Sequence, residues 1–360
     1  MLNQMLSIIG IMGCCLLSHP ALAAPQLTHT TPLPDAHYGI NAPALCETAG
    51  QTLAYLNQGT AYDPNAIHPG TALPIPLSRI KATLRFICKH QAQLNDPIFV
   101  QKHFEFIRWQ PDMEQVKRFA ANKPLLKQLP SDRILMTKYY VHLANASIHP
   151  TKDKPYAIYA LPKDEQALTI EQTNTRPDLT RFHYGKQAIL AGVLDGKHVP
   201  VLAYVNRDDL ESALMQGTIV ADFGEPLGQK TLNVHRNNNI AYDRNKPPYE
   251  QERYWYFKRV GGIKGYGKDA EHKITINTEV TFAGDLTQWG LGKLLMVQYP
   301  AKDGGITTRV GVLADTGGAF VDNLYQVDFL AGTYRGKAGF LQASRDLPDY
   351  VHAYFMVLKR

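Results

Sequence analysis

The stretch GVLADTGGAFVDNLYQVDFLAGTYRGK, residues 311–337, places three aspartates among glycines, apolar residues and tyrosines. Asp315 ends an apolar run and precedes a Gly-Gly pair, which predicts a buried strand that breaks into a tight turn. Asp328 lies in a second apolar run, where strand alternation puts Val327 and Phe329 on one face and Asp328 on the other. Both positions suit carboxylate chemistry. The same patterns also occur in turn residues and in strand residues that face water.

Short apolar runs rich in β-branched and aromatic residues recur upstream and downstream of this stretch, separated by Gly, Asn, Asp and Pro. Such regularly spaced short strands favour a barrel or sandwich over a parallel α/β sheet. The expected strands are Ile134–Leu143, Tyr156–Leu161, Val199–Val205, Gly217–Phe223, Tyr254–Val260, Leu294–Tyr299, Arg309–Ala314 and Tyr350–Leu358.

The N-terminal leader predicts export. Residues 1–23 contain no Asp, Glu, Lys or Arg, and an apolar run is followed by Ala21-Leu22-Ala23, a signal-peptidase pattern. In a second interpretation, Ile11-Met12-Gly13-Cys14 loosely resembles the lead to a lipid-modified cysteine, which would attach the mature chain to the outer membrane through Cys14. We favour the Ala21-Leu22-Ala23 site. Either interpretation predicts a periplasmic protein.

Removal of the leader leaves Cys46 and Cys88 as the remaining cysteines, in an oxidising compartment. We therefore predict a disulfide between them. Each lies in a segment with helical spacing of apolar residues, 44–56 and 77–94.

Composition excludes several functional classes. The formal net charge of +6 is spread along the chain, which argues against nucleic acid and favours an anionic cell-wall polymer. The histidines lack zinc-site spacing, and neither G-x-S-x-G nor a phosphate-binding glycine loop occurs, so we expect no metal and no cofactor. Tyrosine-rich strands and the amides of Gln216 and residues 237–239 suit carbohydrate, although aromatic residues at strand spacing are more often core.

Residues 313–320, LADTGGAF, followed by Val327-Asp328-Phe329, resemble the three-aspartate motif of the membrane-bound lytic murein transglycosylase A family. Thr137-Lys138-Tyr139-Tyr140 is similar to that family's T-G-Y-Y strand, and MQGTIVADFG, residues 215–224, is similar to its Q-G-S-G-x-x-x-F-G block. Similar blocks follow the same order at 154–162, 238–242 and 254–258. The resemblance extends over roughly residues 134–358.

The resemblance implies a mainly β fold with N-terminal helices, in which a double-psi β-barrel domain carries an inserted second β-domain and peptidoglycan binds in the groove between them. We therefore expect a signal peptide at 1–23 and the N-terminal helical part with the first barrel strand at 24–140. The inserted β-domain is expected at 141–252, and the double-psi β-barrel domain with the three-aspartate motif at 253–360.

The resemblance also implies roles for individual residues. Asp328 matches the family's catalytic acid, and Asp315 matches a supporting aspartate. Asp322 matches neither remaining acid position, so we expect a surface or turn residue there. The positions that match glycan-binding residues are Thr137, Tyr139, Gln216, Thr218 and Asn238.

The implied activity is that of a peptidoglycan lytic exotransglycosylase, a lyase that cleaves the MurNAc-GlcNAc β-1,4 bond without water and leaves 1,6-anhydromuramoyl ends. Asp328 would act first as acid and then as base, because its apolar neighbours raise its pKa. Lys138 replaces a family glycine, and residues 332–337 lack an expected acid. Two alternatives therefore remain: a non-catalytic peptidoglycan-binding relative, or a water-using muramidase with Asp315 and Asp328 as its pair. The expected partners are glycan strands and cell-wall synthesis or division proteins.

Overall fold

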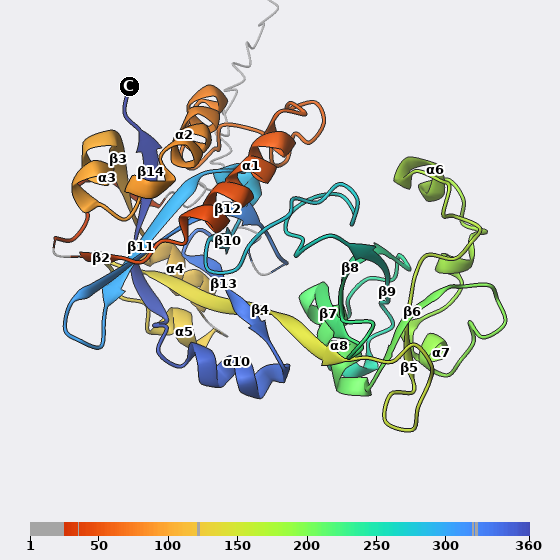
Figure 1. Ribbon diagram of the computed structural model, residues 1–360. Coiled ribbons are helices and arrows are strands. Elements are labelled where there is room, and N and C mark those ends of the chain that lie inside the picture. The colour runs from red at the N-terminus through yellow and green to blue at the C-terminus, as the bar shows by residue number, and fades with distance from the viewer. Residues whose placement is uncertain (1–24, 35, 121–122, 319, 321–322) are drawn as a thin grey trace, which may run out of the picture.

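The computed structural model describes residues 25–34, 36–120, 123–318, 320 and 323–360. The leader with Cys14, and Asp322, lie outside the described residues. The described chain forms two lobes, and one long strand runs from the larger lobe into the smaller one (Figure 1). None of the described helices is both long and apolar enough to cross a bilayer.

The larger lobe is a closed barrel. Around its ring lie β14 (Tyr350–Leu358), β11 (Leu294–Pro300), β12 (Ile306–Asp315), β10 (Thr281–Ala283), β13 (Gln326–Tyr334) and β4 (Ile134–Asn145). β4 also pairs with β14, which closes the ring. The pairs β10–β12 and β13–β4 are parallel and the other ring pairs are antiparallel. The ring confirms the predicted mainly β fold.

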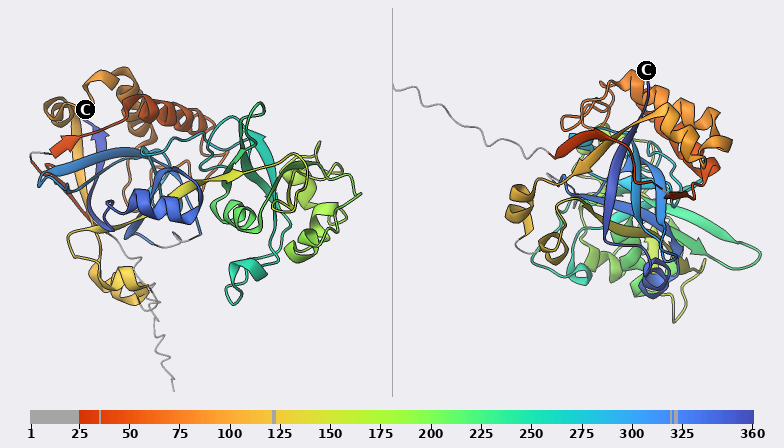
Figure 2. Two further views of the ribbon diagram at one scale, coloured as in Figure 1. Left: turned by 60° about the horizontal axis from the view of Figure 1, so that its bottom comes forward. Right: turned by 90° about the vertical axis from the view of Figure 1, so that its left-hand side faces the viewer.

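Helices and extra strands cover this barrel. β3 (Phe104–Gln110) pairs with β14, β1 (Gln26–Thr30) pairs with β3, and β2 (Ala36–Tyr38) pairs with β12. The helices of this lobe are α1 (Ala42–Leu56), α2 (Leu77–Lys89), α3 (Pro97–His103), α4 (Met113–Phe119), α5 (Pro124–Lys127), α9 (Leu286–Trp289) and α10 (Gly336–Ser344). Both views in Figure 2 show α1 and α2 together on one side of the barrel. The predicted disulfide is confirmed, because Cys46 on α1 is bonded to Cys88 on α2.

The smaller lobe continues from β4. β7 (Thr218–Asp222) pairs with β4, β8 (Gln229–Asn237) with β7, and β9 (Trp255–Val260) with β8. β5 (Tyr156–Tyr159) and β6 (Val201–Val205) form a separate pair, and the helices of this lobe are α6 (Ile170–Asn174), α7 (Lys186–Leu190) and α8 (Arg207–Gln216). Short 3-10 turns lie at 91–93, 180–182 and 248–250.

One strand therefore serves both lobes. Residues 135–142 of β4 pair with β13 in the barrel, and residues 142–145 pair with β7 in the smaller lobe. Each lobe has its own apolar core. Because β4 is continuous through the junction, the backbone hydrogen bonds of one sheet position the smaller lobe against the barrel.

The lobe boundary differs from the predicted one in one strand. We expected residues from 253 onward in the barrel domain, yet β9 pairs with β8, and Tyr254, Tyr256 and Phe257 are buried in the cores of the smaller lobe. The reason is packing: Phe257 lies in one core with Leu232 and Val234 of β8, and Tyr254 and Tyr256 lie in the neighbouring core with Ala157 and Tyr159 of β5. The inserted β-domain therefore extends to the end of β9.

Candidate active site

Two of the three aspartates of the opening stretch lie on either side of one small residue. Ala283 on β10 pairs with Asp315 on β12 and with Asp328 on β13. The β10–β12 register skips Ala314, which places Asp315 opposite Ala283. Residues paired across neighbouring strands share a face of the sheet, so both carboxyl groups lie on the same side of the barrel wall.

Asp328 carries an unpaired carboxylate oxygen. Its Oδ1 is buried and has no hydrogen-bond partner among the described residues. Burial raises the pKa of Asp328 to about 6, and the charge of Asp315 adds to this rise, whereas the Thr137 hydroxyl and the Lys138 ammonium oppose it. A carboxyl group with such a pKa exchanges protons close to neutral pH, as a general acid must.

Both carboxylate oxygens of Asp315 accept hydrogen bonds. Its Oδ2 accepts the Tyr139 hydroxyl at 2.9 Å and its Oδ1 accepts the backbone N–H of Thr316 at 2.8 Å. Burial raises the pKa of Asp315 to about 6, and these two hydrogen bonds and the Lys273 ammonium oppose the rise. Desolvation together with the charge of Asp315 raises the pKa of Tyr139 well above its usual value, so Tyr139 remains a neutral donor.

Strand β4 places polar side chains beside Asp328. Thr137 pairs with Asp328 across the parallel β4–β13 ladder. Its hydroxyl donates to the carbonyl oxygen of Val327 at 3.2 Å and accepts from the Gln326 amide at 2.7 Å, whose oxygen in turn accepts from Asn323 at 2.9 Å. Thr137 and Tyr139, two positions apart on one strand, therefore face the two acids together.

A lysine connects this site to the smaller lobe. Lys273 follows β9 in the chain and donates from Nζ to Asn233 Oδ1 on β8 at 2.8 Å. The Asn233 amide donates to the Thr218 hydroxyl at 2.6 Å. Because Lys273 and Asp315 also interact through their charges, polar groups run from Thr218 through Lys273 to Asp315. Sequence reasoning missed Lys273 and Asn233, since neither lies in a motif.

The remaining predicted glycan-binding residues differ in whether their side chains are already hydrogen-bonded within the protein. Gln216 ends α8 where Gly217 adopts a positive φ of 78°, and its side-chain amide makes no hydrogen bond within the described chain. Thr218 is buried and faces Asn233.

Asn238 is buried, and its amide and carbonyl groups are all used internally, in hydrogen bonds to Tyr184, Ile240, Glu252 and Tyr254. Such a side chain orders the turn after β8 and has no group left for a sugar.

No protein-family model matches the sequence, and no curated protein is significantly similar to it. Solved structures are similar over nearly the whole chain. A membrane-bound lytic murein transglycosylase from Agrobacterium tumefaciens is 17% identical with a TM-score of 0.60, covering 92% of this chain and 97% of that one. E. coli MltA with bound chitohexaose is 16% identical with a TM-score of 0.57, covering 92% and 94%.

MltA from Neisseria gonorrhoeae is 17% identical with a TM-score of 0.54, covering 94% of this chain and 96% of that one. At these identities the likeness concerns the fold. The chain has the fold of the MltA lytic murein transglycosylases, as the sequence blocks led us to expect.

Proposed function

We propose that the protein is a lytic transglycosylase that cleaves the glycan strands of peptidoglycan with Asp328 as its single proton-transferring group. The observation that carries this proposal is the difference between the two acids. Asp328 has a buried carboxylate oxygen without a partner, whereas both oxygens of Asp315 accept hydrogen bonds. The shared fold with structures described as lytic murein transglycosylases, one of them with bound chitohexaose, supports the substrate class.

The reaction proceeds in two proton transfers through one carboxyl group. Protonated Asp328 donates its proton to the oxygen of the MurNAc-GlcNAc bond, and the bond from the MurNAc anomeric carbon to that oxygen breaks. The 6-hydroxyl of the same MurNAc then attacks the anomeric carbon, and the Asp328 carboxylate takes the hydroxyl proton. The products are a free GlcNAc hydroxyl and a 1,6-anhydromuramoyl end, and no water is consumed. The intramolecular hydroxyl supplies the proximity advantage.

Asp315 and Tyr139 act by fixing the charge beside Asp328. An ionised Asp315 raises the pKa of Asp328, and it also faces the positive charge that develops on the sugar ring. A water-using muramidase is the second candidate, because two carboxyl groups flank Ala283 across two strand spacings, roughly 9.5 Å between backbones. In that mechanism Asp315 would have to give up a hydrogen bond to activate water.

Product mass decides among these candidates. Purified sacculi are digested with wild-type protein, with Asp328→Asn and with a control, Asp303→Asn, which changes an exposed turn of the same barrel. We expect muropeptides lighter by one water than hydrolysis products from wild type and control. Asp328→Asn should be at least about 100-fold slower.

Full activity in Asp328→Asn would refute the assignment of the acid, and products with reducing ends would identify the muramidase. Saturable binding to sacculi without released fragments would identify a non-catalytic relative.

We also propose that the protein works in the periplasm, where its partners are glycan strands and cell-wall synthesis or division proteins. The leader supports export, and a disulfide suits an oxidising compartment. The mass of the mature N-terminus distinguishes cleavage after Ala23 from a lipid on Cys14, which would attach the protein to the outer membrane.

A further inference from the structure

A second polar site lies away from the two acids, at the tip of a hairpin. Residues 264–275 form this hairpin, closed by the Lys264–Thr275 bridge. Its base lies beside the active site, because the N–H of Tyr266 donates to the carbonyl oxygen of Ala314. Its tip, residues 268–272, faces β8, β9 and the segment that precedes α6 in the smaller lobe. These residues line an open cavity of about 730 Å³, which we call the tip cavity.

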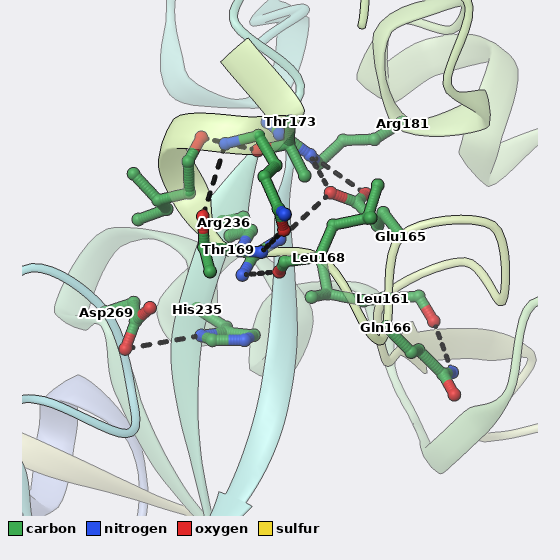
Figure 3. Close-up of polar contacts among 12 residues, drawn as sticks. Leu161, Glu165, Gln166, Leu168, Thr169, Thr173, Arg181, His235, Arg236 and Asp269 are labelled. Atoms are coloured by element: carbon green, nitrogen blue, oxygen red, sulfur yellow. Dashed lines mark hydrogen bonds and ion pairs between the residues drawn. The ribbon is translucent and has the colours of Figure 1, made fainter. Parts of the chain in front are cut away.

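Aromatic and charged groups line the tip cavity. Tyr62 and Lys268 come from the barrel lobe, and Leu168, His235, Phe257 and Arg259 from the smaller lobe. The Lys268 ammonium lies 4.5 Å from the centre of the Tyr62 ring. Figure 3 shows His235 and Asp269 facing one another across the boundary between the lobes. Asp315 and Asp328 are not among the residues that line this cavity.

His235 offers an N–H donor to this cavity. The side chain is 5% exposed, and its Nδ1 accepts the backbone N–H of Ala270 at 3.3 Å. Burial lowers the pKa of His235 to about 4, so the ring is neutral near pH 7 and its proton lies on Nε2. Within the described chain Nε2 has no hydrogen-bond partner, and a ligand atom that accepts a hydrogen bond would satisfy it.

Two cations on the lining are also unmatched. Lys258 and Arg236 there have acid partners, in the pairs Lys258–Glu271 and Arg236–Glu165, and Asp269 contacts the His272 ring. In the described part of the chain, Lys268 and Arg259 have no acid within 4.0 Å. Glu171 is the acid on this lining that lacks an ion pair; hydrogen bonds from its own backbone N–H and from the Thr169 hydroxyl lower its pKa, and the charge of Lys268 adds a smaller effect. The unmatched groups thus suit a ligand with carboxylates and one amine.

A metal ion suits the same place less well. His235, Asp269 and Glu271 bring potential ligand atoms within 4.8 Å of one another. Each carries a donor from the protein already, since Nδ1 of His235 accepts from Ala270, Asp269 Oδ1 accepts from His272, and Glu271 pairs with Lys258. A cation bound there would have to displace these donors.

We infer that the tip cavity binds a short peptide through its free carboxylates, with His235, Lys268 and Arg259 as donors and Glu171 facing its amine. The peptide chemistry is that of the short acidic stems on the muramic acid units of peptidoglycan. This identification rests on the proposed function, because a glycan strand at Asp328 would carry such stems past the hairpin. The cavity would then favour strands that still bear their peptides.

Peptide binding tests this inference directly. A soluble stem tetrapeptide, freed of sugar, is titrated calorimetrically into wild type, Lys268→Ala, Arg259→Ala and the double variant. These exposed positions avoid the folding risk of changing buried His235. Lys127→Ala is the matched control, an exposed lysine on α5 outside the cavity. We expect each single change to weaken binding about two- to fivefold and the double change about tenfold, while the control matches wild type.

Cleavage rates on two substrates provide the second readout. The double variant should lose more kcat/KM on peptide-bearing strands than on strands stripped of peptide by an amidase. Equal loss on both substrates, or equal peptide binding by wild type and double variant, would overturn the inference while leaving the proposed function intact. Peptide binding without any cleavage would instead overturn the proposed function alone. Saturable Zn²⁺ binding that is lost in Asp269→Asn would replace the peptide site with a metal site.

Discussion

At Asp315 both carboxylate oxygens accept hydrogen bonds, and at Asp328 one oxygen is buried without any. An unsatisfied buried oxygen is unfavourable by about 1–3 kcal/mol unless a proton or a ligand meets it. The local sequence predicted that Asp328 would be desolvated, because Val327 and Phe329 flank it. It could not predict that the hydroxyl of Tyr139, on another strand, would donate a hydrogen bond to Asp315. That hydrogen bond is what separates the roles of the two acids.

The pH dependence of cleavage follows from this difference. Asp328 acts first as a proton donor, so the active fraction falls as pH rises through its pKa of about 6. We expect kcat/KM on soluble glycan strands to decline about tenfold per pH unit above that value. A rate that rises with pH through this range would contradict the assignment.

The pH profile of Tyr139→Phe tests whether Asp315 influences the pKa of Asp328. Without the Tyr139 hydroxyl, the pKa of Asp315 rises and Asp315 is neutral over a wider range. The charge of Asp315 then raises the pKa of Asp328 less. The decline of kcat/KM on the alkaline side of the pH profile should therefore begin at lower pH. Tyr350→Phe is the control, because it also loses one hydroxyl hydrogen bond, to Leu125, away from the site. An unchanged pH profile in Tyr139→Phe would show that Asp315 does not tune Asp328.

At the scale of elements, strands with a strong apolar pattern were predictable and the others were not. The predicted strand Ile134–Leu143 is confirmed as β4, which is rich in apolar and aromatic residues and extends to Asn145. β8 was missed because QKTLNVHRN carries few apolar residues, and β10 was missed because it has three residues. Both nevertheless form the site, since β10 separates the two acids and β8 carries Asn233.

The hairpin 264–275 gives an element-scale prediction. Lys273→Met removes the donor to Asn233 and the positive charge near Asp315. We expect kcat/KM to fall about tenfold, because the smaller lobe loses a contact that positions it over the acids. Lys273→Arg should restore most of the activity, since a guanidinium also donates.

The matched control is Lys264→Met, a half-buried lysine of the same hairpin whose Nζ bonds only to Thr275 within it. We expect this variant to retain wild-type kinetics. If Lys264→Met and Lys273→Met lost activity equally, the effect would come from hairpin stability. The pH profile provides an independent check, because only Lys273→Met should raise the pKa of Asp315.

At the scale of the molecule, ordered motifs predicted the barrel and its insertion, but the lobe boundary depended on packing. Residues 254–257 read equally well as a barrel strand, and only the pairing of β9 with β8 and the burial of these aromatic residues in the cores of the smaller lobe assign them to that lobe. Asn238 illustrates the same limit. An amide in a sugar-binding motif and an amide that orders a turn look alike in sequence, and tertiary contacts alone separate them.

The disulfide can be assigned a role for the whole fold. Cys46 and Cys88 are separated by 42 residues and join α1 to α2, which pack on β12 and β14 of the barrel. Closing a loop of that length limits the unfolded chain and stabilises the fold by about 4 kcal/mol in the chain-entropy model. Both helices lie in the barrel lobe, so the bond should act on the stability of that lobe without altering the acids.

We therefore expect a Cys46→Ala/Cys88→Ala protein to lose about 3–4 kcal/mol of unfolding free energy, measured by urea denaturation, with kcat/KM near that of wild type at 25 °C. A reducing agent should destabilise the wild type by the same amount and leave the double variant unchanged, which separates loss of the bond from any repacking around alanine. Equal stability of oxidised wild type, reduced wild type and variant would mean that the packing of α1 against α2 suffices alone. The oxidising compartment would then matter little to this fold.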